Sequence, residues 1–279
     1  MPHKYTGRYL IYVKTDIYKE NVIVTQQMVN ITMYVDGYKR SIVTGNKNFK
    51  DGFQLPDTAT FAILGEGFMA QYIGFINTAG PIKEQAVALQ VHADRAAFLN
   101  CLMEGYHDTL YANLGRHFFR DCQITGTVDF IFGDATIVFQ NCNIYLRKPL
   151  KENVLTAQSK EKNKDNTGFV LQNCNFLADH TLERQKGKFK SYLGRPWKLY
   201  STTIVMESYI GDLILPKGLC FMLNLTIGDQ GLGTSDRVTW LGYRVIKRKE
   251  ATRFTVDQFL QGETWLTNLG VPVHFGLFT

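Results

Sequence analysis

A six-residue pattern recurs along the chain and limits the possible folds more than any other feature of the sequence. Each copy has an apolar residue three positions before a cysteine and another two positions after it: Phe98–Met103, Phe119–Ile124, Phe139–Ile144 and Leu171–Phe176. Looser copies without the cysteine occur at Ala70–Phe75 and Met206–Gly211. The copies recur at irregular intervals of roughly twenty to thirty-five residues, which predicts stacked coils with loops of varied length, a parallel β-helix. A propeller would require a longer and steadier period.

The repeat places four cysteines, Cys101, Cys122, Cys142 and Cys174, at one register of successive coils. Neighbouring strands lie roughly 4.8 Å apart. The cysteines are therefore expected either to stack as buried thiols or to pair as neighbours, Cys101 with Cys122 and Cys142 with Cys174. Cys220 has no partner in this pairing, which argues against a fully bridged framework.

The composition and the turn signals predict an all-β chain with a single domain. Val, Ile, Thr, Tyr and Phe dominate, and 45% of the residues are apolar, enough for a sizeable core. No linker-like or low-complexity segment interrupts residues 1–279, so one domain is expected. The exception to the β pattern is Thr255–Leu266, where Thr255 and Gln258 fit a capping box and predict a short helix packed on the β-helix.

The formal net charge of +6 suits an acidic partner, either a nucleic acid or an anionic polysaccharide, and equally suits simple solubility. The basic residues are scattered, with only Lys186–Lys190 and Lys247–Lys249 locally dense, so no nucleic-acid partner is expected. No run is apolar and long enough to span a membrane. The first residues carry Lys4 and Arg8 and lead directly into a strand pattern, which does not predict a signal peptide.

Two acidic residues are expected to lie side by side. The segment Thr125–Gly133 predicts a buried strand, and Asp129 within it needs compensation because a carboxylate is costly to remove from water. Asp129 lies seven residues after Cys122, and Asp108 lies seven residues after Cys101. If the coils stay aligned, one carboxyl can remain ionised while its neighbour holds a proton, as a nucleophile and a general acid do. The alternative is two exposed acids at strand ends.

Three further side chains are candidates for the same site. Gln85 precedes Asp108 by about one coil and either offers an amide N–H or satisfies a turn. Arg195 can hold a carboxylate ionised through bidentate hydrogen bonds. Trp197 offers a flat face to a sugar ring, although most tryptophans serve in packing.

Four motifs in this order resemble those of plant-type pectin methylesterases (pectinesterases): Gln85–Leu89, Tyr106–Tyr111, Gly126–Gly133 and Leu193–Lys198. The resemblance runs from about Tyr9 to Val273. It implies a right-handed parallel β-helix and a carboxylic ester hydrolase that removes methyl esters from homogalacturonan (pectin) and releases methanol. It also implies a monomer that needs no metal or cofactor, is secreted to the plant cell wall, and has a proteinaceous pectinesterase inhibitor as a possible partner.

The resemblance assigns the chemistry to particular side chains. Asp129 is expected to attack the ester carbonyl, and Asp108 to protonate the departing methanol and then activate water. Arg195 is expected to orient Asp129 and keep it charged. Trp197 and Phe130 are expected to contact the sugar.

The oxyanion is expected to be stabilised by Gln85 and by the residue before Asp108. The family usually has glutamine at that second position, whereas this chain has His107. A neutral histidine offers one N–H in its place, and losing an oxyanion donor costs about 10²–10³ in rate. Alternatively, His107 faces away, because adjacent strand residues alternate sides.

Two segments depart from the family pattern. Residues 218–233 are shorter and differ in sequence, and the strand and helix that cap the first coil are expected to be missing before Tyr9. His107 and the changed segment 218–233 leave a second hypothesis, a catalytically impaired pectin-binding relative. A third is another pectin-active β-helix, a lyase or a polygalacturonase, although the sequence lacks an acidic calcium cluster and a Gly-His-Gly motif.

Overall fold

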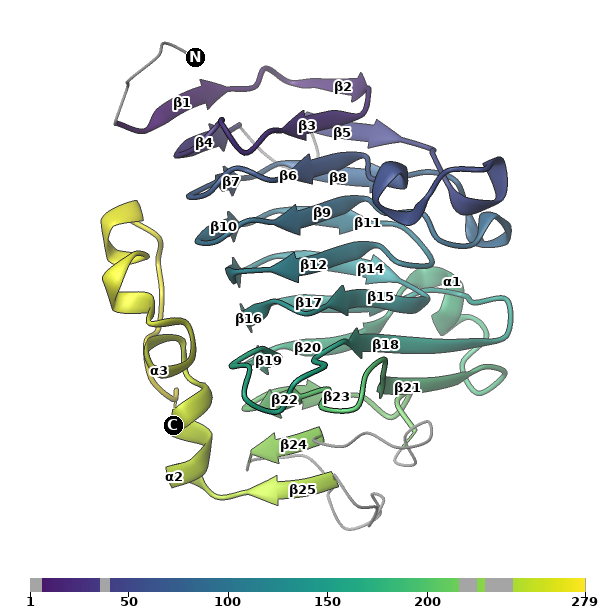
Figure 1. Ribbon diagram of the computed structural model, residues 1–279. Helices are drawn as coiled ribbons and strands as arrows, with labels where there is room; N and C mark the ends of the chain where they lie inside the picture. Colours follow the sequence, from purple (N-terminus) through teal and green to yellow (C-terminus); the bar gives the residue numbers. More distant parts are fainter. Residues whose placement is uncertain (1–6, 36–40, 216–224, 229–242, 279) are drawn as a thin grey trace.

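The chain forms stacked coils whose strands lie in three sheets (Figure 1). The computed structural model describes residues 7–35, 41–215, 225–228 and 243–278. Every strand pair within these ranges is parallel, as expected for a parallel β-helix. Cys220 and most of segment 218–233 lie outside the described residues, so the expectations for them are not addressed.

The described strands divide among sheets A, B and C, and each coil contributes a strand to most of them. Sheet A has ten strands: β1 (Tyr9–Tyr12), β4 (Ile31–Tyr34), β7 (Met69–Gln71), β10 (Ala96–Leu99), β13 (Arg116–Arg120), β16 (Thr136–Gln140), β19 (Gly168–Gln172), β22 (Thr203–Met206), β24 (Leu225–Gly228) and β25 (Tyr243–Ile246). Sheet B has eight strands: β2 (Asp16–Lys19), β5 (Ser41–Gly45), β8 (Gly74–Asn77), β11 (Leu102–Glu104), β14 (Gln123–Gly126), β17 (Asn143–Leu146), β20 (Asn175–Ala178) and β23 (Tyr209–Ile210). Sheet C has seven strands: β3 (Val22–Val24), β6 (Phe61–Ile63), β9 (Leu89–His92), β12 (Leu110–Leu114), β15 (Val128–Gly133), β18 (Glu152–Gln158) and β21 (Lys190–Pro196).

The helical elements in the described residues are short. Three are α-helical: α1 (His180–Glu183), α2 (Arg248–Ala251) and α3 (Val256–Leu260). Six are 3₁₀ turns: η1 (Phe49–Asp51), η2 (Leu55–Thr58), η3 (Pro81–Lys83), η4 (Thr252–Phe254), η5 (Gly262–Thr264) and η6 (Thr267–Leu269). No helix among the described residues has the length and apolar character needed to cross a bilayer.

The repeated pattern marks the corner between sheets A and B. The residue before each cysteine has a left-handed backbone, with φ of 50° at Asn100, 54° at Asp121, 57° at Asn141 and 53° at Asn173. Asn and Asp adopt this conformation more readily than other non-glycine residues, which explains their recurrence at this position. The register confirms the alignment of the four cysteine-containing copies. The expected copy starting at Met206 is wrong by one residue, because Val205 pairs with Leu171.

Aromatic rings and cysteines stack in the interior of the coils. The rings of Phe98 and Phe119 are 4.6 Å apart, and those of Phe119 and Phe139 are 4.8 Å apart. The four cysteines of the repeat are buried and free, and each thiol lies within hydrogen-bond distance of backbone carbonyls. Of the two expectations, the structure therefore favours stacked thiols over disulfide pairs.

The segment Thr125–Gly133 is not one strand, contrary to expectation. It crosses a corner, since β14 ends at Gly126 and β15 begins at Val128 in a different sheet. The apolar pattern continues across the corner because residues on both sides of it face the interior. Periodicity alone could not reveal the break.

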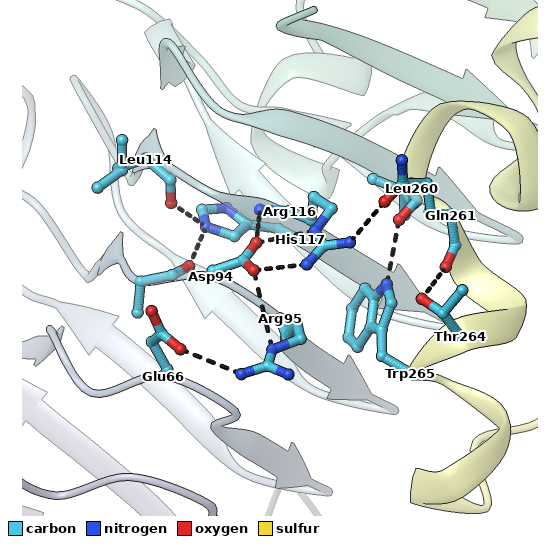
Figure 2. Close-up of polar contacts among 11 residues, drawn as sticks. Glu66, Asp94, Arg95, Leu114, Arg116, His117, Leu260, Gln261, Thr264 and Trp265 are labelled. Atoms are coloured by element: carbon cyan, nitrogen blue, oxygen red, sulfur yellow. Dashed lines mark hydrogen bonds and ion pairs between the residues drawn. The ribbon is translucent and has the colours of Figure 1, made fainter.

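The C-terminal segment packs against the outer face of sheet A. Figure 1 shows α2, α3 and the following turns running alongside this sheet, and an apolar cluster joins Phe118 and Val138 of the sheet to Leu260 and Leu266 of the segment. Figure 2 shows part of the polar border of this contact, where Arg116 bonds to Gln261 at 3.1 Å. A short helical segment packed on the β-helix is therefore confirmed.

The expected capping box of that segment is wrong. Thr255 is the N-cap residue of α3, but its hydroxyl donates to the Thr252 carbonyl and does not cap the helix. Gln258 instead donates to the carboxylate of Asp257. The preceding 3₁₀ turn supplies the nearer acceptor, so the hydroxyl bonds backwards along the chain.

His117 is fully buried beside this border (Figure 2). Its Nε2 lies 3.0 Å from the Ala93 carbonyl and 2.7 Å from the Leu114 carbonyl, so this nitrogen carries the proton and donates. Burial lowers the pKa of His117 to about 4. The imidazole is therefore neutral at neutral pH and ties the turn between β12 and β13 to the coil beneath it.

Candidate active site

An open groove of about 460 Å³ lies on the outer face of sheet C. Its lining includes all but one of the side chains expected at the site: Gln85, His107, Asp108, Asp129, Arg195 and Trp197. Gln85 precedes β9, His107 and Asp108 precede β12, and Asp129 and Arg195 lie on β15 and β21. Successive coils therefore bring together residues that are far apart in the sequence, as the seven-residue offset predicted for the two acids.

A β-bulge aims Asp129 into the groove. Val128 pairs with Val154 and Ile131 with Thr156, so β15 contains one more residue than β18 over this stretch. Asp129 occupies the bulge with φ 48°, in the left-handed region. Bulges change the direction in which a side chain points, and here the change places a carboxylate on the outer face between apolar neighbours.

Phe130 does not line the groove, so the expected sugar contact is wrong. Its side chain is fully buried in the interior, as is that of Ile131. The bulge puts both residues inside, and Phe132 is the next ring to reach the outer side. Phe130 fills the space over Gly126, where a Cβ would lie 2.3 Å from the Cβ of Phe130.

Arg195 pairs with the carboxylate of Asp129 at two points. The guanidinium Nε lies 2.9 Å from Oδ1 and 3.1 Å from Oδ2, and a terminal nitrogen of the same group donates to Oδ2. Only 8% of the Asp129 side chain is exposed, so this two-point pairing compensates a carboxylate largely removed from water.

Asp108, unlike Asp129, is not paired with a guanidinium in the part of the chain that the structure describes. Its side chain is buried, with no cationic group as close as Arg195 is to Asp129 among the described residues. Burial raises the pKa of Asp108 well above its ordinary value, and the neighbouring charge of Asp129 raises it further. Carboxylate oxygens of the two acids lie within 4.8 Å of each other. The two carboxyls therefore differ in their surroundings, since a guanidinium binds Asp129, whereas burial and the charge of Asp129 act on Asp108.

Both acids also have strained backbones. Asp108 has φ 64° and Asp129 has φ 48°. Each left-handed non-glycine residue costs on the order of 1–3 kcal/mol and persists only where surrounding structure enforces it. The hydrogen bond from the Asp108 N–H to the Val128 carbonyl, at 3.1 Å, is one such constraint.

Gln85 and His107 lie side by side at the edge of the groove, where they form an isolated parallel bridge. Nε2 of His107 is 3.4 Å from Oδ1 of Asp108, so His107 faces the site rather than away from it. Burial lowers the pKa of His107, although the charges of Asp129 and Glu84 oppose the shift. Oε1 of Gln85 is buried without a hydrogen-bond partner among the described residues.

Aromatic side chains extend the groove beside the acids. Trp197 is 42% exposed, and its ring centroid lies 6.1 Å from that of Phe132. Phe132 stacks on Tyr111 with centroids 4.5 Å apart. The sequence interpretation missed Phe132 and Tyr111. The same alignment could have identified them, because Tyr111 follows Asp108 by three residues and Phe132 follows Asp129 by three.

The fold and site together define a class: a parallel β-helix protein with two neighbouring aspartates, one of them bound by an arginine, in an open, aromatic-edged groove. Comparison with known sequences is consistent with this class, since the model of the pectinesterase family matches residues 1–263. The chain belongs to the pectinesterase family.

Similar proteins are found among curated sequences. Pectinesterase 1 of Citrus sinensis is 48% identical over 99% of this chain and half of its own length. The pectinesterase/pectinesterase inhibitor of Ficus pumila var. awkeotsang is 46% identical over the whole chain and 54% of its own length. The chain thus spans about half the length of the curated relatives it matches.

A solved structure supports the architecture. Pectin methylesterase from carrot is 42% identical, with a TM-score of 0.95 over 99% of this chain and 91% of that one. The described coils therefore form a right-handed parallel β-helix, as expected from the resemblance.

Proposed function

We propose that the chain is a carboxylic ester hydrolase that removes methyl esters from homogalacturonan and releases methanol. The observation that carries this proposal is the asymmetric pair of aspartates, with carboxylate oxygens within 4.8 Å and only Asp129 bound by Arg195. Membership of the pectinesterase family supports the substrate class. The names of the Citrus and carrot proteins support the same reaction.

The first half of the reaction uses the two acids in different roles. A carboxylate oxygen of Asp129 attacks the ester carbonyl, whose π electrons move to its oxygen and form an oxyanion. Collapse of this intermediate breaks the bond to the methoxy group, and Asp108 gives its proton to that group, so methanol leaves. Burial and the charge of Asp129 raise the pKa of Asp108, which favours the protonated form that donates. An acyl-enzyme anhydride on Asp129 remains.

The second half reverses the role of Asp108. As a carboxylate, Asp108 takes a proton from water while the water oxygen attacks the acyl carbon. The bond to Asp129 breaks, and the product leaves as a carboxylic acid that keeps the second proton of the water and loses it to solvent. Asp108 is again protonated and Asp129 is again a carboxylate. Arg195 favours this step because it stabilises Asp129 as the leaving carboxylate.

Gln85 and His107 are proposed to donate to the oxyanion. Their adjacent positions at the edge of the groove and the lowered pKa of His107, which favours the neutral imidazole, support this role. The alternative, a catalytically impaired pectin-binding protein, rested on His107 and on the altered segment 218–233. The approach of His107 to Asp108 favours an active enzyme instead. Trp197 and Phe132 are proposed to contact the sugar rings.

The proposal extends to the setting of the enzyme. We infer that residues 1–279 act as one monomeric catalytic domain in the plant cell wall, with a proteinaceous inhibitor as a partner. The plant relatives support the location, and the combined name of the Ficus protein is consistent with the inhibitor.

Methanol release from methyl-esterified pectin tests the proposal. The purified chain should release methanol without shortening the polymer. Binding to pectin with no methanol released at any pH from about 5 to 9 would favour the impaired relative. Unsaturated or shortened oligogalacturonides would indicate a lyase or a polygalacturonase.

A further inference from the structure

His107 completes a group of three metal-ligating side chains in the groove. One nitrogen of His107 and one carboxylate oxygen each from Asp108 and Asp129 lie within 4.8 Å of one another. Imidazole nitrogen with carboxylate oxygen is a donor set that suits Zn²⁺ and other divalent transition metals, whereas Mg²⁺ and Ca²⁺ prefer oxygen alone.

The geometry needs only a small adjustment to bind an ion. Tetrahedral Zn²⁺ with bonds of about 2.0–2.2 Å holds its ligand atoms about 3.3–3.6 Å apart. The 3.4 Å between Nε2 of His107 and Oδ1 of Asp108 matches this spacing. The three donor atoms lie within 4.8 Å of one another, so a side-chain movement of roughly 1 Å brings the widest pair to the same spacing.

The surroundings provide access and a further polar atom. The three side chains line an open groove, so an ion can enter from solvent with its remaining water ligands. The backbone of Gln85 forms a bridge with that of His107. The side-chain oxygen Oε1 of Gln85 is buried and has no partner among the described residues. An unpartnered buried oxygen is costly, and a metal-bound water beside it would supply the missing hydrogen bond.

Arg195 is the main opposing group, since its positive charge lies against Asp129. It donates twice to Oδ2 but only once to Oδ1, so Oδ1 keeps a second lone pair. A metal can therefore bind Asp129 without displacing Arg195, although with reduced affinity. Glu84, whose charge acts on His107, partly offsets this repulsion.

We propose that His107, Asp108 and Asp129 form an inhibitory site for a divalent transition metal ion such as Zn²⁺. The proposed hydrolysis does not use this ion. Bound metal occupies the lone pair of the nucleophile and removes the proton-donating form of Asp108, so both roles are blocked. The inhibition rests on the proposed function, whereas the metal binding does not.

Direct Zn²⁺ titration of the chelator-treated protein, followed by calorimetry, tests the site independently of catalysis. The wild-type chain should bind one equivalent, and His107→Gln should weaken that binding at least tenfold, since it removes the nitrogen ligand. His180→Gln, a change at an exposed histidine on α1, is the matched control and should leave the affinity unchanged. Equal affinity in wild type and His107→Gln would overturn the proposal.

Asp108→Asn provides a second ligand variant, which should also weaken Zn²⁺ binding at least tenfold. Co²⁺ bound to the wild type should give an absorption spectrum typical of nitrogen and oxygen ligands. His107→Gln should lose this spectrum, and the same spectrum in both proteins would contradict the assignment. If metal-free protein releases methanol, Zn²⁺ should inhibit it at the concentrations that saturate the site. Saturation without inhibition would overturn the inhibitory role. A metal-free protein without esterase activity would refute the proposed function alone.

Discussion

Removing the guanidinium of Arg195 should strongly impair the nucleophile. Arg195→Ala deletes the two-point pairing with Asp129, and hydrogen bonds to charged groups contribute about 1.5–3 kcal/mol each. The Arg195 side chain is 38% exposed, so water replaces part of this stabilisation. We therefore expect a combined loss of about 2–3 kcal/mol, equivalent to a fall in kcat/KM of about 30- to 150-fold.

The assay is kcat/KM for methanol release from esterified pectin. Arg195→Lys keeps the charge but not the planar fork, so its loss should be intermediate. Arg184→Ala, at an exposed arginine, is the control. An Arg195→Ala enzyme with wild-type kcat/KM would refute this account of Asp129.

Three other perturbations test separate parts of the structure. Asp108→Asn should lower kcat by at least about 10²-fold. It should also remove the alkaline limb of the pH profile of kcat/KM, because the raised pKa of Asp108 sets the pH at which the proton donor is lost. A retained alkaline limb would contradict this role. The pKa of His117 is lowered from 6.5 to about 4. The free energy of unfolding should therefore be highest above about pH 6.5 and should fall by about 3 kcal/mol as the pH drops towards 4. His117→Gln should flatten urea-unfolding stability over this range, and an unchanged slope would exclude His117 as the cause. Gly126→Ala should destabilise the fold by about 2–3 kcal/mol or more, because its Cβ would meet Phe130. Gly276→Ala, where the Cβ would have open space, is the control and should leave the melting temperature unchanged. Equal melting temperatures for the two variants would count against the packing argument.

The sequence predicted the features that depend on alignment between coils. The cysteine repeat gave the parallel β-helix, because identical positions on successive coils must stack. The common offset from Cys101 and Cys122 gave the pairing of Asp108 and Asp129 for the same reason. Both inferences require only that adjacent coils have the same number of residues between the aligned positions.

Features that depend on local backbone geometry were not predictable in this way. An extra residue in β15 put Phe130 inside and Phe132 on the outer side, and strict alternation contains no signal for a bulge. The contact between Arg195 and Asp129 joins strands that are two coils apart, with β18 between them. Only the family resemblance connected them in advance. The hydroxyl of Thr255 followed the nearer carbonyl rather than the capping pattern.

The central claim is that two neighbouring aspartates divide the roles of nucleophile and proton donor, and methanol release by Asp129→Asn tests it most directly. The substitution keeps the size of the side chain but removes the attacking carboxylate. We expect turnover to fall to background while the thermal unfolding temperature shows that the coils remain folded. Methanol release at the wild-type rate from a folded Asp129→Asn protein would contradict the claim.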